Sequence, residues 1–96
     1  MTPLTTAQII AKLPEIDGWS FADGFLCKTV ITKDFKAAFS LMTRIAFEAE
    51  QLNHHPTWEN TYNSIQFKLS THDCAGVSQK DFELAKIIDT ITKNAF

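Results

Sequence analysis

The stretch from Asp34 to Pro56, DFKAAFSLMTRIAFEAEQLNHHP, decides the fold because it is the longest regular pattern in the chain. Its apolar residues recur at steps of three and four, which is the spacing of one face of an α-helix. Asp34 is a residue type that caps helix N-termini, and Pro56 disfavours helical geometry at the residue before it. We therefore predict a helix from Asp34 to about Leu52 that stops at or just before two adjacent histidines. The repeating apolar positions are Phe35, Ala38, Phe39, Met42, Ile45, Ala46 and Ala49.

The residues before this helix predict a shorter helix and a β-hairpin. Thr5 or Thr6 can cap the short helix, and Pro14 can end it. Residues 19–31, WSFADGFLCKTVI, predict a hairpin that turns at Asp-Gly (23–24), because this dipeptide accepts the positive φ angles of a tight turn. The apolar stripe of the short helix would be formed by Ile9, Ile10 and Leu13.

The residues after the long helix predict a second hairpin and a last helix. In WENTYNSIQFKLST, residues 58–71, Trp58 to Tyr62 predicts one strand, Asn-Ser (63–64) the turn, and the alternating residues that follow the next strand. Ser78 can cap the last helix, with Asp81 three residues later as in a capping box. The buried face of that helix would be formed by Phe82, Ala85, Ile88 and Ile91.

The predicted order is α-β-β-α-β-β-α. Hairpins join antiparallel strands, and a long amphipathic helix can cover a sheet. The fold class is therefore α+β, with a four-stranded antiparallel sheet and helices packed on one face. At 96 residues the chain is expected to form a single domain, residues 1–96, because a second core would not fit in that length.

Composition excludes several classes of function. The chain is 45% hydrophobic and 21% charged, which is typical of a globular protein, and no apolar run is long enough to cross a membrane. The net charge is -2 and the cations are scattered, whereas direct nucleic-acid binding needs them clustered. The N-terminal residues do not resemble a signal peptide, so we expect a cytoplasmic protein in which Cys27 and Cys74 are free thiols.

The histidine pair, His54 and His55, allows three interpretations. A metal site is disfavoured, because adjacent side chains diverge and the third histidine, His72, lies 17 residues on, unlike the short repeated spacings of zinc sites. We therefore expect no metal, and we expect Cys74 to be a small packed thiol rather than a nucleophile. The pair by itself fits a polar helix end as well as it fits an acid–base site.

Three features favour the acid–base interpretation. Glu50 precedes His54 by four residues, so on a continuing helix its carboxylate would share a face with that ring and fix its tautomer. Trp58 and Tyr62 offer flat surfaces to a planar ligand, although core packing is the usual role of such residues. The second hairpin can return His72 toward the pair, which would make a cleft suited to proton transfer. Asp81 can serve the last helix as a cap and the cleft as a carboxylate.

The run E-x3-H-H-P-x5-Y-x9-H-x8-D resembles the signature of the pterin-4a-carbinolamine dehydratases. The similarity covers roughly residues 15 to 93, and the predicted order of elements agrees with the fold of that family. Asn53 departs from the pattern, since relatives often carry aspartate there. The residues that carry the resemblance are Glu50, His54, His55, Pro56, Tyr62, His72 and Asp81.

The resemblance implies an enzyme, a hydro-lyase that removes water from 4a-hydroxytetrahydropterin (4a-hydroxytetrahydrobiopterin). The product is quinonoid dihydropterin, so that the cofactor of aromatic amino-acid hydroxylases can be recycled. The C4a–oxygen bond must break while the N5 proton departs. One general acid and one general base suffice for this, and no cofactor or metal is implied.

The resemblance also implies roles for single residues. His54, His55 and His72 would be catalytic, with His54 and His72 transferring protons and His55 chiefly positioning the pterin. Substrate-binding or supporting roles, such as orienting a histidine, bordering the pocket or hydrogen bonding to the substrate, would fall to Glu50, Asn53, Trp58 and Asp81.

Partners follow from the same resemblance. Members of the family are homodimers or homotetramers, and vertebrate members also act as dimerisation cofactors of a transcription factor. A non-catalytic protein-binding module, or an assembly factor, is thus the alternative function. The three histidines favour catalysis, with the pterin as substrate and an aromatic amino-acid hydroxylase or a transcription factor as a further protein partner.

Overall fold

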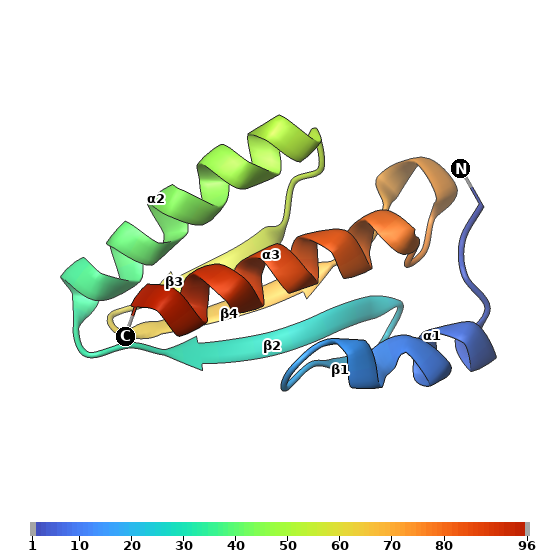
Figure 1. Cartoon of the computed structure of the whole chain (residues 1–96), viewed down its shortest axis with the longest axis horizontal. Helices are drawn as coiled ribbons and strands as arrows, with labels where there is room; N and C mark the ends of the chain where they lie inside the picture. The colour runs from blue at the N-terminus through green and yellow to red at the C-terminus, as the bar shows by residue number, and fades with distance from the viewer. Residues whose placement is uncertain (1, 96) are drawn as a thin grey trace.

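The computed structural model describes residues 2–95, and its order of elements confirms the predicted α-β-β-α-β-β-α arrangement. Residues 2–95 form three α-helices and one four-stranded sheet, and short connections join these elements (Figure 1). The elements are α1 (Thr6–Lys12), a 3-10 helix η1 (Leu13–Glu15), β1 (Ser20–Ala22), β2 (Phe25–Ile31), α2 (Phe35–Leu52), β3 (Thr57–Thr61), β4 (Ser64–Leu69), a 3-10 helix η2 (His72–Cys74) and α3 (Gln79–Ala95).

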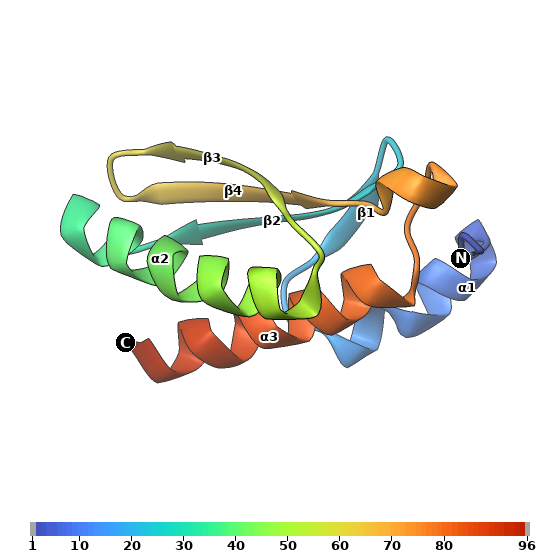
Figure 2. The ribbon, with the colours of Figure 1, turned by 90° about the horizontal axis from the view of Figure 1, so that it is seen from above.

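All strand pairs of the sheet are antiparallel, in the order β1-β2-β4-β3. The central pair runs from Leu26 opposite Leu69 at one end to Ile31 opposite Ser64 at the other. Figure 2 shows the helices on one side of the sheet, as predicted. Apolar side chains that alternate along the strands meet those of α2 and α3 in one core, because a strand turns every second residue to the same face. The core includes Leu26, Val30, Ile45, Ile65, Phe67, Leu69, Phe82 and Ile88.

The N-terminal elements confirm the predicted cap and turn and correct the apolar stripe. Thr5 caps α1 in a capping box with Gln8. Asp23 and Gly24 have φ angles of 52° and 83°, as a two-residue hairpin turn requires. Ile10, however, is 59% exposed, whereas its neighbour on α1 is buried. Adjacent helical positions point about 100° apart, so a short helix buries only one of them.

Helix α2 begins and ends where predicted, but it buries a different face. Asp34 caps it by accepting from the Ala37 N–H at 2.8 Å. Phe35 and Phe39 are 49% and 59% exposed, so the prediction that they belong to the buried stripe is wrong. Small side chains at two of the buried positions let the helix pack closely against the core. The buried residues are Ala38, Leu41, Ile45 and Ala49.

The second hairpin turns one residue earlier than predicted. Thr61 pairs with Ser64, so the loop is Tyr62-Asn63, and β3 starts at Thr57. Tyr62 adopts a φ angle of 50°, a conformation that favours glycine or asparagine. The predicted turn at residues 63–64 rests on the preference of asparagine and serine for turns. The observed register is set instead by the alternation in β4 that buries Ile65 and Phe67.

Helix α3 confirms its predicted cap and buried face. The Asp81 carboxylate accepts from the Ser78 N–H at 2.8 Å, and Ser78 Oγ accepts from the Lys80 N–H at 3.3 Å. Every predicted apolar position of this helix is buried. Within residues 2–95, none of the helices combines the length and the apolarity that crossing a bilayer requires.

Candidate active site

The end of helix α2 determines where the histidine pair lies. Asn53 is in the left-handed region at φ 54°, and the N–H of His54 returns to the carbonyl of Ala49 at 3.0 Å. This is the closure by which a left-handed residue ends a helix. Asparagine is among the few residues other than glycine that tolerate this conformation. Asn53, rather than Pro56, thus turns the chain out of the helix.

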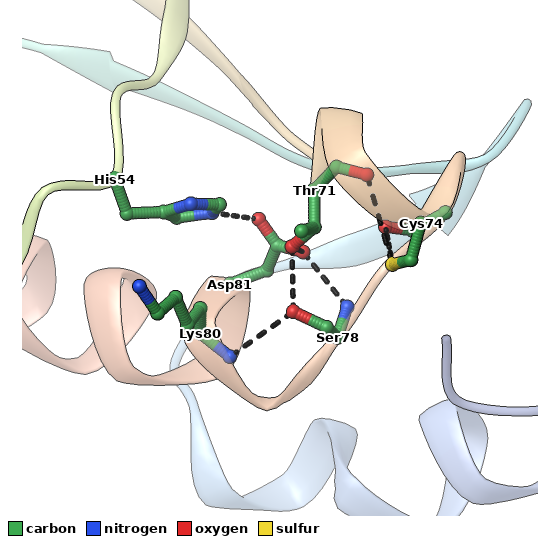
Figure 3. Close-up of polar contacts among 7 residues, drawn as sticks. His54, Thr71, Cys74, Ser78, Lys80 and Asp81 are labelled. Carbon is green, nitrogen blue, oxygen red and sulfur yellow. Dashed lines mark hydrogen bonds and ion pairs between the residues drawn. The ribbon is translucent and has the colours of Figure 1, made fainter. Parts of the chain in front are cut away.

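His54 is bound to Asp81, which comes from the first turn of α3. The Nε2 atom of His54 lies 2.5 Å from Oδ1 of Asp81, whose side chain is fully buried. The other oxygen, Oδ2, accepts from the Thr71 hydroxyl and from the Ser78 N–H, each at 2.8 Å. Figure 3 shows these contacts converging on the carboxylate. Asp81 is therefore both a cap of α3 and the partner of a histidine.

The partner of His54 determines its tautomer. A carboxylate only accepts hydrogen bonds, so Nε2 must carry the proton. Within residues 2–95, Nδ1 makes no hydrogen bond, and the ring lines a pocket. Nδ1 is thus the nitrogen that can accept a proton. The same logic governs histidines held by a carboxylate in hydrolases.

Glu50 contacts a different histidine from the one that the spacing suggested. Its Oε1 lies 2.8 Å from Nε2 of His55, and both side chains are largely exposed, at 78% and 61%. The expectation that Glu50 shares a face with His54 is wrong, because the left-handed Asn53 ends the helix before His54. Glu50 still contacts an imidazole, as the sequence suggested.

All three histidines line one open pocket of about 340 Å³. His72 reaches it from η2, where β4 has brought the chain back beside the end of α2, as the hairpin predicted. This volume lies in the range of small-molecule sites. The remaining lining residues are Asn53, Ser70, Thr71 and Asp73. Of these, only Asn53 was predicted, since hydroxyl groups beside a histidine form no recognisable spacing.

The two aromatic candidates lie outside this lining. Trp58 packs against the core, with its ring 6.0 Å from that of Phe67, so the role of Trp58 at the edge of the pocket stays a prediction. Tyr62 is 63% exposed in the β3–β4 turn, at the end of the sheet away from Leu69 and the pocket. In the part of the chain that the structure describes, no group of three or more His, Cys, Asp or Glu residues is arranged to hold a metal ion.

The fold and the pocket define a class: an α+β protein whose helices cover one face of an antiparallel sheet, with an imidazole–carboxylate pair at the end of that sheet. Residues 2–91 match the family model described as pterin 4 alpha carbinolamine dehydratase. The chain belongs to this family.

Individual relatives agree with the family match. A putative pterin-4-alpha-carbinolamine dehydratase of Christiangramia forsetii is 45% identical over 94 residues, covering 98% of this chain and 97% of the relative. One of Rhizobium meliloti is 46% identical, covering 90% and 85%. The crystal structure of a transcriptional coactivator/pterin dehydratase from Brucella melitensis superposes with a TM-score of 0.91 at 34% identity, covering 95% of this chain and 99% of that one.

Proposed function

We propose that the chain dehydrates 4a-hydroxytetrahydropterin to quinonoid dihydropterin and water. The C4a–oxygen bond breaks, the N5 proton leaves, a double bond forms between N5 and C4a, and the departing hydroxide gains a proton. The observation that supports this best is the convergence of three imidazoles on one pocket, one of them held by a buried carboxylate. Such groups can take and give the two protons without a metal or a further cofactor.

The roles of the histidines follow from their surroundings. His54 is the general base in this proposal, because Nδ1 is its unprotonated nitrogen and Asp81 stabilises the positive charge that forms on the ring. His72 is the general acid, since it is exposed and can regain its proton from water. His55, held by Glu50, positions the pterin. The Asn53 amide, which also lines the pocket, hydrogen-bonds to the pterin.

Stopped-flow dehydration of 4a-hydroxytetrahydropterin tests this proposal. The wild-type protein is expected to accelerate the loss of the 4a-hydroxy compound. His54→Ala and His72→Ala are each expected to lower kcat roughly 10²- to 10⁴-fold, the usual contribution of a general acid or base. His55→Ala is expected chiefly to raise KM.

Tyr62→Phe is the control for these substitutions, because Tyr62 lies away from the pocket. Each variant is checked for native circular dichroism. Folded His54→Ala and His72→Ala proteins with the wild-type kcat would refute the acid–base roles. A wild-type protein that does not change the rate at all would refute the enzymatic function.

We also propose that the chain acts as a homo-oligomer, a dimer or a tetramer. Three phenylalanines of α2 are exposed, namely Phe35, Phe39 and Phe47. Exposed aromatic side chains gathered on one helix are typical of a surface that another protein covers. The alternative of a protein-binding role would use the same surface, and the Brucella relative is described as a transcriptional coactivator as well as a pterin dehydratase. Cytoplasmic location is part of the proposal, in keeping with the free thiols of Cys27 and Cys74.

A further inference from the structure

Two buried hydroxyl groups lie behind the carboxylate that holds His54. Thr71 and Ser78 are 5% and 0% exposed, and their side-chain oxygens are 2.5 Å apart. Thr71 Oγ1 donates to Oδ2 of Asp81, and Ser78 Oγ accepts from the Lys80 N–H. Figure 3 shows these contacts as one connected set that begins in the first turn of α3 and ends at the carboxylate.

The direction of each proton in this set follows from the number of donors. A hydroxyl group has one proton to donate. Thr71 gives its proton to Asp81, so Ser78 must donate in the contact between the two hydroxyls. The Ser78 proton is free for this contact, because in its other contact Ser78 Oγ is the acceptor, from the Lys80 N–H. Each group therefore has a fixed role, and none of the hydroxyl protons remains for a substrate.

These contacts fix the orientation of the carboxylate. Oδ2 accepts from the Ser78 N–H on one side and from Thr71, which follows β4, on the other. A carboxylate held by the N–H alone could rotate about that contact, whereas a second donor from another segment prevents this rotation. Oδ1 is then directed at Nε2 of His54, whose ring lines the pocket.

We propose that Thr71 and Ser78 are positioning residues for the dehydration. Through Asp81 they keep His54 in the Nε2–H tautomer and hold its ring so that Nδ1 is presented to the pterin. The kinetic part of this inference rests on the proposed function, whereas the tautomer of His54 is a property of the protein without substrate. A purely structural role, capping α3 and anchoring the loop after β4, predicts no change in the tautomer.

The test compares Thr71→Val, which removes the hydroxyl at nearly constant shape, with Thr71→Ser, which keeps it. Thr32→Val is the matched control. Thr32 is 6% exposed, its hydroxyl lies 2.8 Å from the Asp34 carbonyl and 3.2 Å from that of Asn63, and it follows β2 at the end of the sheet opposite the pocket. The control thus loses a buried, hydrogen-bonded threonine hydroxyl that is remote from His54.

The first readout is the nitrogen chemical shifts of the His54 ring, measured by NMR without substrate at a pH where the ring is neutral. The wild-type, Thr71→Ser and Thr32→Val proteins are expected to show the Nε2–H tautomer. Thr71→Val is expected to show a mixture of both tautomers. A pure Nε2–H tautomer in Thr71→Val would overturn the inference, even if that variant were less stable.

The second readout is the split between kcat and KM. Thr71→Val is expected to lower kcat roughly 10- to 100-fold, by analogy with the loss of a group that orients a metal-bound histidine. KM should change little, because the hydroxyl is turned to Asp81. Thr71→Ser should restore kcat, and Thr32→Val should keep it. Equal kcat values for Thr71→Val and Thr32→Val would overturn the inference.

Two further outcomes are distinguishable. If Thr71→Val did not fold, Thr71→Ala would be read in the same two ways, since it removes the same hydroxyl donor to Asp81 with a smaller side chain; an unchanged tautomer and kcat would again overturn the inference. If the wild-type protein lacked dehydratase activity, the proposed function would fail, while the NMR comparison would still decide the role of the hydroxyls.

Discussion

Asn53 shows how much one residue decides at this site. Its left-handed backbone ends α2, separates His54 from the face of Glu50 and directs the histidine pair into the pocket. The resemblance to the family led us to expect an acid at this position. The structure gives a physical reason for an amide, since asparagine accepts a left-handed φ angle and presents hydrogen-bonding groups without charge.

Substitutions at Asn53 separate these two contributions. Asn53→Val is expected to lower the free energy of unfolding by about 1–2 kcal/mol, because a β-branched residue is strained at this φ angle. Asn53→Gly should keep the wild-type stability but raise KM roughly 2- to 10-fold, the loss of one neutral hydrogen bond to the substrate. Urea unfolding and steady-state kinetics measure the two effects. An unchanged KM in Asn53→Gly would limit the residue to ending the helix.

At the scale of elements, the two hairpins differ in how well their turns suit their sequence. Asp23-Gly24 is a favourable pair for a two-residue turn, and its position was predicted correctly. Tyr62-Asn63 is a less favourable pair for such a turn, and the predicted turn lies one residue later than the observed one. The buried alternation of β4 overrides the local preference of Tyr62, because shifting the register by one residue would expose Ile65 and Phe67.

This strain predicts a stabilising substitution. Tyr62→Asn is expected to raise the free energy of unfolding by about 0.5–1 kcal/mol, since asparagine tolerates the φ angle of 50° better than tyrosine. The kinetic constants should not change, because the turn and the pocket lie at opposite ends of the sheet. Urea unfolding measures the first effect. A lower stability would show that the exposed ring makes contacts that outweigh the strain.

At the scale of the whole molecule, α2 buries two alanines beside Leu41 and Ile45 and leaves its phenylalanines outside the core. Ala38 and Ala49 face the core, whereas Phe35 and Phe39 lie on the surface with their rings 6.0 Å apart. A chain of 96 residues has a limited core, so covering such side chains in an oligomer would add to its stability.

Removal of these rings tests the proposed oligomer. The double substitution Phe35→Ser and Phe39→Ser is expected to reduce the sedimentation coefficient to that of a smaller species, with the wild type remaining a dimer or tetramer at the same concentration. Ile10→Ser is the matched control, because Ile10 is 59% exposed, like Phe39, but lies on α1. A wild-type protein that sediments as a monomer at all concentrations would contradict the proposal.

The sequence by itself determined the order of elements, the caps at Asp34 and Ser78 and the first hairpin, because these depend on local spacing and backbone preference. It also named the three histidines that meet at the pocket. Only the tertiary structure decided which carboxylate contacts which ring. Glu50 binds His55, and Asp81 binds His54 across 27 positions, because the chain turns at Asn53 and folds back through β3 and β4. Thr71 and Ser78 likewise gain their partners only when β4 and α3 meet, since a hydroxyl carries no spacing that marks its role.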